Sequence, residues 1–386
     1  MDVTLRGSVV ADGRVIADGV VATSTDTISF VGATHDYPEP PPPRQNVMIL
    51  PGLIDVHCHG GGGYGFGESG IAGALSARDF HRRAGSTSML ASLVTAPVDK
   101  LTERLAELCD VVHSGELAGI HLEGPFLSRM RCGAQDPRYI IDGDPNLLDE
   151  LLTAGGGGVR SVTLAPETAY FADMARLLHD NGVVVSVGHT DAPHMSTTHA
   201  VIDRAGGRLS ATHLFNAMAP LLPRQPGTVA ACLAAAGRGE MVVELIGDGV
   251  HLDPATVSMV FDLVGPHQIA LISDAMAAAG MGDGQYTLGT ANVTVRNGVA
   301  RLSERPDDRG EPAIAGGTST MLDVVRVTVL GGVDIADAVT AASSTPAALL
   351  GLCDRGVLRR GLRADLVVTD PELALRRVMV AGKWLT

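Results

Sequence analysis

Two histidines separated by one residue mark the stretch of the chain where chemistry is most strongly indicated. His57 and His59 follow the apolar run Val47–Val56 and precede the glycines at 60–63. Side chains two residues apart on a β-strand point to the same side, so both imidazoles can face one metal ion. Two ligands do not complete the four-coordinate site that zinc usually has, and the pair could equally be polar residues that end a buried strand. The assignment therefore depends on further ligands elsewhere.

Four more polar side chains lie where other apolar runs stop: Glu123, His189, His213 and Asp274. A single histidine in such a place is more often a buried imidazole with a backbone partner, and Asp274 could be a helix N-cap. Taken with the first pair, however, the glutamate and the two histidines give five nitrogen or oxygen ligands from four strand ends. A mononuclear or dinuclear zinc or iron site needs such a number. Asp274 beside it could take a proton from a water molecule and pass it to a leaving group.

Two other polar residues near these ends have more than one interpretation. His121 shares a strand face with Glu123, and we expect a satisfied core histidine or a hydrogen-bond partner of a ligand. Arg224 would suit a phosphate through its forked guanidinium, although a solvated surface arginine is an equal alternative. The glycine-rich segments 60–67 and 155–158 do not fit a phosphate loop or a dinucleotide fingerprint, so they predict turns.

The elements that must position these residues alternate along the chain. Apolar, strand-like runs occupy residues 47–56, 88–94, 117–122, 159–164, 183–187, 208–211, 241–246 and 268–272. Stretches that can be helical lie between most of them, which predicts an α/β fold with a parallel (β/α)8 TIM-like barrel. An open doubly wound sheet would give a similar pattern. The barrel is favoured because every candidate ligand follows a strand, and all strand ends share one rim in a barrel.

Helices are predicted over residues 76–83, 98–113, 169–180, 192–204 and 255–263. After the last barrel strand, Asn297-Gly298 predicts a hairpin over residues 292–302. The loop at 315–320 leads into a further predicted helix over 321–330, with its hydroxyl residues as caps.

Both ends of the chain predict a second, small β-sandwich domain. Residues 2–32 are typical of short strands, with Asp12-Gly13 as a hairpin turn, and residues 365–380 have the same character. Two unrelated tails are the alternative. The predicted division is residues 1–50 and 353–386 for the small β domain, and residues 51–352 for a metal-dependent hydrolase barrel.

Composition limits the classes of partner. Of the 386 residues 45% are hydrophobic, enough for a large core, yet no apolar run suggests a membrane span. The net charge of −14 without a basic block makes nucleic acid and anionic membranes poor partners, although a local basic pocket could still bind an anionic small molecule. Five scattered cysteines and the lack of a signal-peptide pattern at the start predict a reducing, cytoplasmic location.

Five segments of the chain together resemble one known family. They are His57-x-His59, His-Leu-Glu-Gly-Pro-Phe at 121–126, Gly-His-Thr at 188–190, Thr-His-Leu-Phe-Asn-Ala-Met at 212–218 and Ser-Asp-Ala-Met at 273–276. They resemble the N-acetylglucosamine-6-phosphate deacetylase family of the amidohydrolase superfamily, over nearly the whole chain. The second and fourth segments are the specific part, whereas His-x-His is shared across the superfamily.

The resemblance implies hydrolysis of the acetamide of N-acetyl-D-glucosamine 6-phosphate to D-glucosamine 6-phosphate and acetate. Such an enzyme would serve amino-sugar catabolism and cell-wall sugar recycling. A metal-activated water would be the nucleophile, with its pKa lowered to about 7, and Asp274 would be the general base and acid.

The resemblance also implies the metal site, formed by His57, His59, Glu123, His189, His213 and Asp274. Glu123 and the two later histidines resemble the ligands of one divalent cation. The His-x-His pair with Asp274 resembles a second site, where some members have glutamine and asparagine and hold one metal. This chain has both histidines, so we expect two cations bridged by Glu123. Zinc is expected first, with iron, manganese or cobalt as alternatives.

Substrate contacts are implied at Ala134, Gln135, Asn216, Ala217, Arg224, His251, Ile314, Ala315 and Gly316. Arg224 resembles a family position that reaches the phosphate in the neighbouring subunit, so the resemblance implies a homodimer. Gln135 stands where other members carry a histidine, which leaves open whether this position polarises the acetyl carbonyl. Cys132, in the same segment, matches no family role.

Three other functions remain compatible with the residues. A cyclic-amide or nucleobase hydrolase of the same superfamily could use the same metal shell, although none of these strand ends carries the lysine with which dihydroorotase-type members often bridge their metals. A non-catalytic sugar-phosphate binding protein would keep the pocket but would not need Asp274. A structural barrel would bind no stoichiometric metal.

Overall fold

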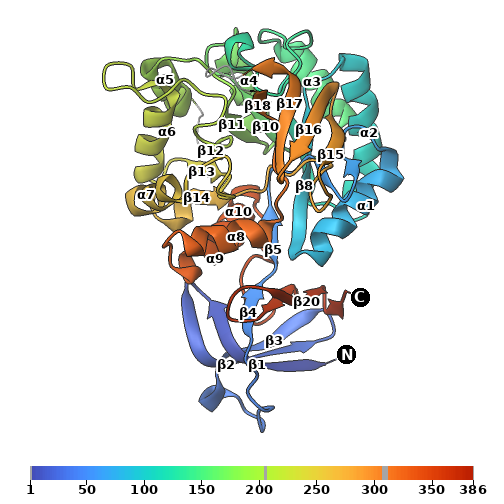
Figure 1. The fold of residues 1–386 in the computed structure, drawn as a ribbon, viewed down its shortest axis with the longest axis vertical. Helices are drawn as coiled ribbons and strands as arrows, with labels where there is room; N and C mark the ends of the chain where they lie inside the picture. The colour runs from blue at the N-terminus through green and yellow to red at the C-terminus, as the bar shows by residue number, and fades with distance from the viewer. Residues whose placement is uncertain (1, 204–206, 307–311, 386) are drawn as a thin grey trace.

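Eight parallel strands form the centre of the larger part of the molecule (Figure 1). In this computed structural model, which describes residues 2–203, 207–306 and 312–385, they pair in the order β14-β13-β12-β11-β10-β9-β8-β5. Their bounds are β5 (Leu53–Asp55), β8 (Ser86–Val94), β9 (Gly119–Glu123), β10 (Val159–Leu164), β11 (Val184–Val187), β12 (Leu209–Ala211), β13 (Val242–Leu245) and β14 (Ile269–Leu271). The predicted (β/α)8 barrel is confirmed.

The first and last strands of this sheet meet just beyond their C-terminal ends. Cys58 and Ala275 form an isolated parallel bridge. The amide of His59 donates to the carbonyl oxygen of Ala275 at 2.7 Å, and the amide of Asp274 donates to the carbonyl oxygen of His57 at 3.0 Å. The barrel therefore closes through the residues that the sequence marked as candidate ligands, which fixes their backbones relative to one another.

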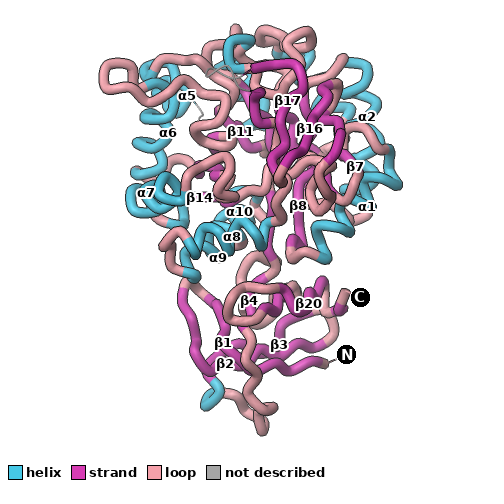
Figure 2. The backbone as a smooth tube through the Cα atoms, in the orientation of Figure 1, coloured by secondary structure: helices cyan, strands magenta, loops and turns pink. Residues whose placement is uncertain are grey.

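Helices cover the outside of the barrel, whereas loops surround its mouth (Figure 2). The helices are α1 (Gly70–Arg83), α2 (Val98–His113), α3 (Pro145–Ala154), α4 (Phe171–Asp180), α5 (His194–Asp203), α6 (Gly227–Gly237), α7 (Pro254–Val264), α8 (Met321–Leu330), α9 (Ile335–Ala342) and α10 (Ser344–Leu350). The six predicted helices are confirmed, except that Arg204, the last residue predicted for α5, lies outside the described residues. Sequence reasoning missed α3, α6, α9 and α10. Within the described ranges, none of the helices is long and apolar enough to cross a bilayer.

An antiparallel sheet is inserted after β14 and stands over the mouth of the barrel in Figure 1. Its strands are β15 (Gly284–Leu288), β16 (Ala291–Arg296), β17 (Val299–Pro306) and β18 (Pro312–Ile314). The predicted hairpin is confirmed as β16 and β17, and its turn residues Asn297 and Gly298 have φ angles of 51° and 74°. A short ladder of β6 (Gly60–Gly61) and β7 (Tyr64–Gly65) follows His59.

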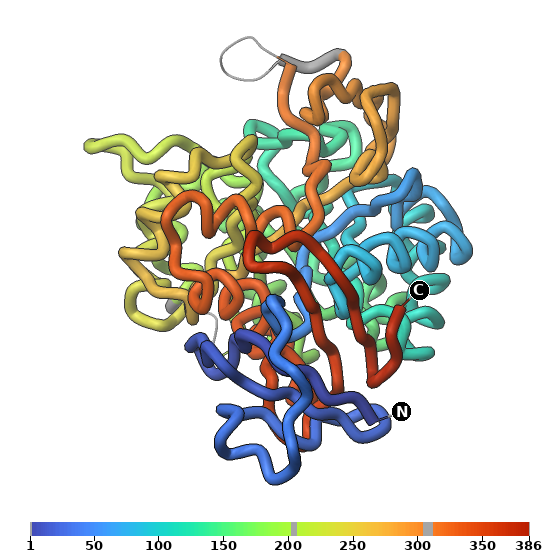
Figure 3. The backbone as a smooth tube through the Cα atoms, turned by 60° about the horizontal axis from the view of Figure 1, so that its bottom comes forward, coloured from blue at the N-terminus to red at the C-terminus, as the bar shows by residue number. Residues whose placement is uncertain are grey.

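Strands from both ends of the chain form one seven-stranded sheet, ordered β21-β20-β19-β4-β1-β2-β3. They are β1 (Val3–Ala11), β2 (Arg14–Ser24), β3 (Thr27–Ala33), β4 (Met48–Pro51), β19 (Leu366–Thr369), β20 (Leu375–Val380) and β21 (Lys383–Trp384). Figure 3 shows the red C-terminal strands beside the blue N-terminal segments, and the two share one apolar cluster that includes Leu5, Ile49 and Met379. The predicted small β domain is confirmed. Its boundaries after residues 50 and 352 stay a prediction.

Strand β4 connects this domain to the site. It pairs with β1 and β19 and leads through Gly52 directly into β5. An added Cβ at Gly52 would lie 2.1 Å from the hydroxyl oxygen of Thr87 on β8, so only glycine fits this passage. The small domain therefore holds the N-terminal end of β5, while the histidines follow its C-terminal end.

The contact between the two chain ends can be tested at Gly382, in the turn before β21. Its φ is +75°, and an added Cβ would lie 1.8 Å from the carbonyl oxygen of Thr25. Gly13 has a φ of +69° with nothing within 4 Å of such an atom, so it is a matched control. We expect Gly13→Ala to lower the free energy of unfolding by about 1 kcal/mol, and Gly382→Ala to lower it by a further ~1–3 kcal/mol. Denaturant unfolding measures both, and equal losses would contradict the close approach.

Candidate metal centre

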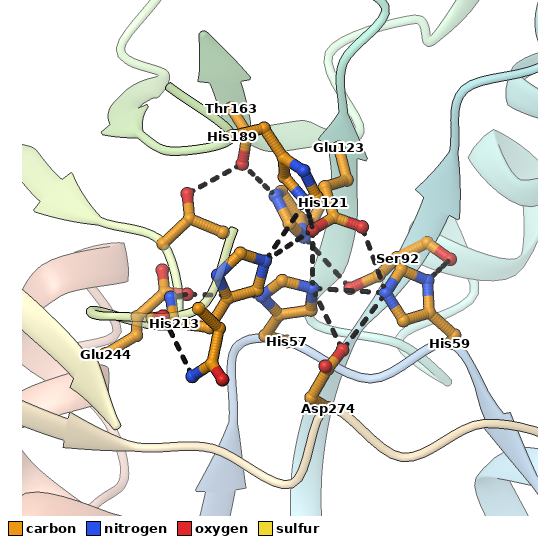
Figure 4. A network of polar contacts seen from close by, with 12 residues as sticks. His57, His59, Ser92, His121, Glu123, Thr163, His189, His213, Glu244 and Asp274 are labelled. Atoms are coloured by element: carbon orange, nitrogen blue, oxygen red, sulfur yellow. Dashed lines mark hydrogen bonds and ion pairs between the residues drawn. The ribbon is translucent and has the colours of Figure 1, made fainter. Parts of the chain in front are cut away.

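Four imidazoles and two carboxylates meet at the C-terminal ends of the barrel strands (Figure 4). Each belongs to the end of a strand or follows it directly: His57 and His59 after β5, Glu123 at the end of β9, His189 after β11, His213 after β12 and Asp274 after β14. All six side chains are buried. The structure thus brings together every residue that the sequence marked as a metal ligand, from strands far apart in the chain.

Glu123 belongs to two sets of atoms that could each hold a metal ion. One set is His57, His59 and Glu123, and the other is Glu123, His189 and His213, with the donor atoms of each set within 4.8 Å of one another. Its Oε1 lies 2.9 Å from Nε2 of both His189 and His213. Its Oε2 lies 3.2 Å from Nε2 of His59. Imidazole and carboxylate donors at such spacing suit zinc and similar divalent cations.

The rings of His59 and His189 turn Nε2 toward the centre because Nδ1 is engaged behind them. Nδ1 of His59 lies 3.2 Å from the carbonyl oxygen of Ser92, and Nδ1 of His189 lies 2.8 Å from that of Arg131. A carbonyl oxygen can only accept, so Nδ1 carries the proton in each neutral ring and the Nε2 lone pair is left for a metal. Nδ1 of His213 is buried without a partner among the described residues.

His57 is held differently, by a carboxylate that sequence reasoning missed. Nδ1 of His57 lies 3.2 Å from Oε2 of Glu244, which is buried on β13. The available signal was a carboxylate inside the apolar run 241–246, because a buried carboxylate requires a polar or charged partner.

His121, in contrast, is a satisfied buried histidine as predicted. Its Nδ1 lies 3.0 Å from the Ser92 hydroxyl. Burial and the nearby His57 hold the pKa of His121 well below the usual range.

The carboxylates control the protonation of the nearby rings. Burial lowers the pKa of both His57 and His59, but Asp274 and Glu123 outweigh it. The result is a pKa well above the usual range for His57 and of about 9 for His59. Burial raises the pKa of Asp274, but His57 and His59 outweigh that effect and hold it at about 2. In the metal-free protein, protons on these rings therefore take the place of cations.

The charges of the site call for cations. Glu123, Asp274 and Glu244 are all buried, and their ion pairs are with histidines. No lysine or arginine in the described ranges forms an ion pair with any of the three. Buried carboxylates without a compensating charge are costly. The imidazole and carboxylate donors, together with the excess of buried negative charge, fit divalent metal ions.

Three of these candidate ligands have strained backbones. His189, His213 and Asp274 have φ angles of 45°, 31° and 46°, in the left-handed region that non-glycine residues rarely adopt. Such conformations cost about 1–3 kcal/mol each and cluster at functional sites. The strain turns each side chain from the end of its strand into the barrel mouth, and it is not visible in the sequence.

A cavity of about 690 Å³ opens above the ligands. Most of the predicted substrate contacts line it: Ala134, Gln135, Asn216, Ala217, His251, Ile314 and Gly316. Ala315 is fully buried and does not line it. Arg224 is exposed on the segment between β12 and α6 and does not line the cavity of its own chain, so the structure does not bring it to this site.

Two polar residues of the cavity wall have defined partners. The amide nitrogen of Gln135 donates to Oε2 of Glu123 at 2.6 Å, while its oxygen accepts from the amide of Thr95 at 2.7 Å. Nδ1 of His251 lies 2.8 Å from Asp248. Burial lowers the pKa of His251, but Asp248 outweighs it and raises the pKa, which favours a positive ring beside the cavity.

Comparison with known proteins agrees with this geometry. The model of the amidohydrolase family matches residues 48–385. The N-acetylglucosamine-6-phosphate deacetylase of Bacillus subtilis is 33% identical over 95% of this chain and 92% of its own. An N-acetylgalactosamine-6-phosphate deacetylase of Escherichia coli O157:H7 is 33% identical over 95% of this chain and 93% of its own.

The solved structures agree as well. An N-acetyl-D-glucosamine-6-phosphate deacetylase mutant from Mycobacterium smegmatis, in complex with N-acetyl-D-glucosamine-6-phosphate, is 39% identical to this chain. It covers 99% of both chains with a TM-score of 0.92. The resemblance seen in the sequence is confirmed.

The raised pKa values predict that metal binding releases protons. The pKa of His59 is about 9 and that of His57 is raised well above its usual range, so both rings favour the protonated form in the metal-free protein at neutral pH. A metal needs neutral rings, so loading the metal-free protein with zinc should release about two protons per chain. Calorimetry in buffers with different ionisation enthalpies measures this number.

The matched control is His57→Gln with His59→Asn, which removes both titrating rings and leaves the second set of donors. This variant should release fewer protons than the wild type. Equal release by the two proteins would contradict protonated rings in the metal-free site.

Proposed function

The chain belongs to the amidohydrolase family, and we propose that it removes the acetyl group of N-acetyl-D-glucosamine 6-phosphate. The products would be D-glucosamine 6-phosphate and acetate, in amino-sugar catabolism and cell-wall sugar recycling. One observation carries the proposal: four imidazole Nε2 atoms and two carboxylates converge, and all of these residues except the fully buried His57 line a cavity large enough for a sugar phosphate. The names of the relatives supply the substrate.

Two divalent cations, zinc first, are part of this proposal. Glu123, His189 and His213 would hold one cation, and His57, His59 and Asp274 would hold the other, with Glu123 between them. Support comes from the three buried carboxylates, which pair with histidines and with no lysine or arginine among the described residues. Cations held here would polarise the acetamide carbonyl and lower the pKa of a water molecule.

Asp274 is proposed as the general base and acid. Its Oδ1 lies 3.4 Å from Nε2 of His57 and 3.3 Å from Nε2 of His59. Its lowered pKa keeps it ionised at neutral pH, so it can accept a proton from the attacking water. The same oxygen would then deliver that proton to the departing amine.

The phosphate needs positive charge in the wall of the cavity. His251, which lines the cavity and is paired with Asp248, is proposed to supply part of it within the chain. Arg224 is proposed to supply the rest from the neighbouring subunit of a cytoplasmic homodimer, because it is exposed on a segment that leaves its own cavity.

Acetate release tests the function. N-acetyl-D-glucosamine 6-phosphate should be hydrolysed much faster than unphosphorylated N-acetyl-D-glucosamine. N-acetyl-D-galactosamine 6-phosphate is the second candidate substrate, because the relative from Escherichia coli O157:H7 bears that name at the same 33% identity. Faster turnover of this sugar phosphate would reassign the substrate, and no acetate from any of the three would contradict the deacetylase proposal.

Replacement of the proposed base should abolish turnover without emptying the site. We expect Asp274→Asn to keep the cation of Glu123, His189 and His213 but to lose about a hundred- to ten-thousand-fold in kcat, because the amide cannot accept the water's proton. Metal analysis and acetate release measure the two effects. Asp262→Asn, an exposed position on α7, is the control and should leave both unchanged. Near-normal turnover by Asp274→Asn would remove this residue from the mechanism.

Loss of Arg224 should weaken substrate binding. We expect Arg224→Ala to raise KM about 10- to 100-fold with a smaller change in kcat, because a charge-assisted bond to phosphate is lost. The control is Arg176→Ala, which removes an exposed arginine on α4 and should change neither KM nor kcat. An unchanged KM in Arg224→Ala would show that Arg224 does not hold the phosphate.

Mixed dimers show which subunit Arg224 serves. When Arg224→Ala and Asp274→Asn chains are mixed, a hybrid dimer has one site with both residues intact, provided that Arg224 acts across the interface. At a substrate concentration well below the wild-type KM, where loss of Arg224 is limiting, the mixture should then recover about a quarter of wild-type activity. Recovery would be absent if Arg224 served its own chain.

A further inference from the structure

We propose that Glu244 is a positioning residue that enables the His57/His59 half of the centre to hold a cation, an inference that rests on the proposed two-cation site. Glu244 lies on β13 beneath the ligands and is 2% exposed. Figure 4 shows it on the side of His57 away from His59. It does not line the cavity, so it acts through His57 rather than on substrate.

The contacts of Glu244 reach ligands of both proposed cations. Oε2 lies 3.2 Å from Nδ1 of His57 and accepts from the backbone amide of His213 at 3.3 Å. The backbone carbonyl oxygen of Glu244 accepts from the amide of Leu214 at 2.8 Å. One residue therefore orients the ring of His57 and fixes the strained segment that carries His213.

His57 differs from the other ligand histidines in the charge of its partner. The rings of His59 and His189 are backed by neutral carbonyl oxygens, whereas that of His57 is backed by a carboxylate. A carboxylate on Nδ1 selects the tautomer with Nε2 free and makes the ring a stronger ligand. His57 is thus the histidine of this centre best prepared to hold a divalent cation.

A chain of buried hydrogen bonds fixes Glu244 in place. Its Oε1 accepts from Ser186 at 3.5 Å and from Ser210 at 3.4 Å. Short contacts of 2.6 to 3.0 Å then link Ser186, Thr212, Thr163, His121 and Ser92. This series of hydrogen bonds ends beside His59, because the carbonyl oxygen of Ser92 contacts Nδ1 of that ring. The two histidines of the pair are therefore supported by one connected network.

The charge of Glu244 also favours a second cation. With neutral rings, the carboxylates of Glu123, Asp274 and Glu244 exceed one divalent cation by one negative charge. Without Glu244 a single cation would already neutralise the other two carboxylates. A second one would then add two positive charges to a buried site in which, of the described residues, only Asp55, whose carboxylate accepts from the backbone amide of His57, is left to offset them, and that is costly. Removing this charge should therefore weaken the binding of the second cation rather than the first.

Zinc content after removal and reloading of metal tests the proposal. We expect wild type to hold two zinc ions per chain, and Glu244→Gln to hold one, with the affinity of the other site lowered about 10- to 100-fold. Glutamine keeps the shape and can still accept from Nδ1, so this variant isolates the charge. Ser210→Ala, which removes one hydrogen bond to the same carboxylate but no charge, is the matched control and should hold two. Two equally tight ions in Glu244→Gln would overturn the proposal.

Diffraction at the zinc absorption edge locates the ions. In Glu244→Gln the signal should remain between Glu123, His189 and His213 and fade at His57 and His59, whereas a general loss of structure would remove both. If this variant does not fold, wild-type crystals decide: zinc on Nε2 of His57 with Nδ1 against Glu244 supports the proposal, and zinc on Nδ1 overturns it.

The metal measurements are independent of the reaction. A wild-type chain that holds two zinc ions but releases no acetate would contradict the proposed function and leave the role of Glu244 standing. A wild-type chain that holds one zinc ion under saturating metal would contradict this inference, while acetate release would still support the deacetylase.

Discussion

The arrangement of this molecule depends on one electrostatic constraint: three carboxylates are buried at the barrel mouth, and their ion pairs are with histidines. Glu123, Asp274 and Glu244 cannot stay ionised there without positive charge. In the metal-free chain, raised pKa values at His57 and His59 provide it as protons. In the working protein we propose that divalent cations provide it, so proton and metal compete for the same nitrogen atoms.

The fold satisfies this constraint by using the closure of the barrel. Backbone hydrogen bonds from His59 to Ala275 and from Asp274 to His57 join the first and last strands. The small domain anchors the other end of β5 through β4. The positions of the candidate ligands are thus set by the whole circumference of the sheet. The strain at His189 and His213 is sustained because backbone hydrogen bonds of the residues on either side hold both ends of each turn.

Sequence reasoning predicted the elements that follow from apolar periodicity and the polar residues that follow the ends of strands. The eight barrel strands follow apolar runs, and the ligands follow those runs because a parallel barrel gathers all C-terminal ends at one rim. Helix α6 was missed because its glycines and alanines, as in Gly227–Gly237, show no polar face. Glu244 was missed because its partner, His57, is 187 positions away. The left-handed backbone conformation of Asp274 depends on tertiary packing, so the neighbouring residues in the sequence do not predict it.

The departure at Gln135 changes how the proposed reaction must be supported. Its amide nitrogen donates to Glu123 and its oxygen accepts from the backbone amide of Thr95, so both ends of this buried side chain are engaged, one of them at a candidate metal ligand. A side chain engaged in this way is not positioned to polarise an acetyl carbonyl in the cavity. That task then falls to the proposed cations, whose binding depends on the charge around them. Glu244, Gln135 and the buried network beneath His57 therefore belong to the same functional unit as the ligands that they hold.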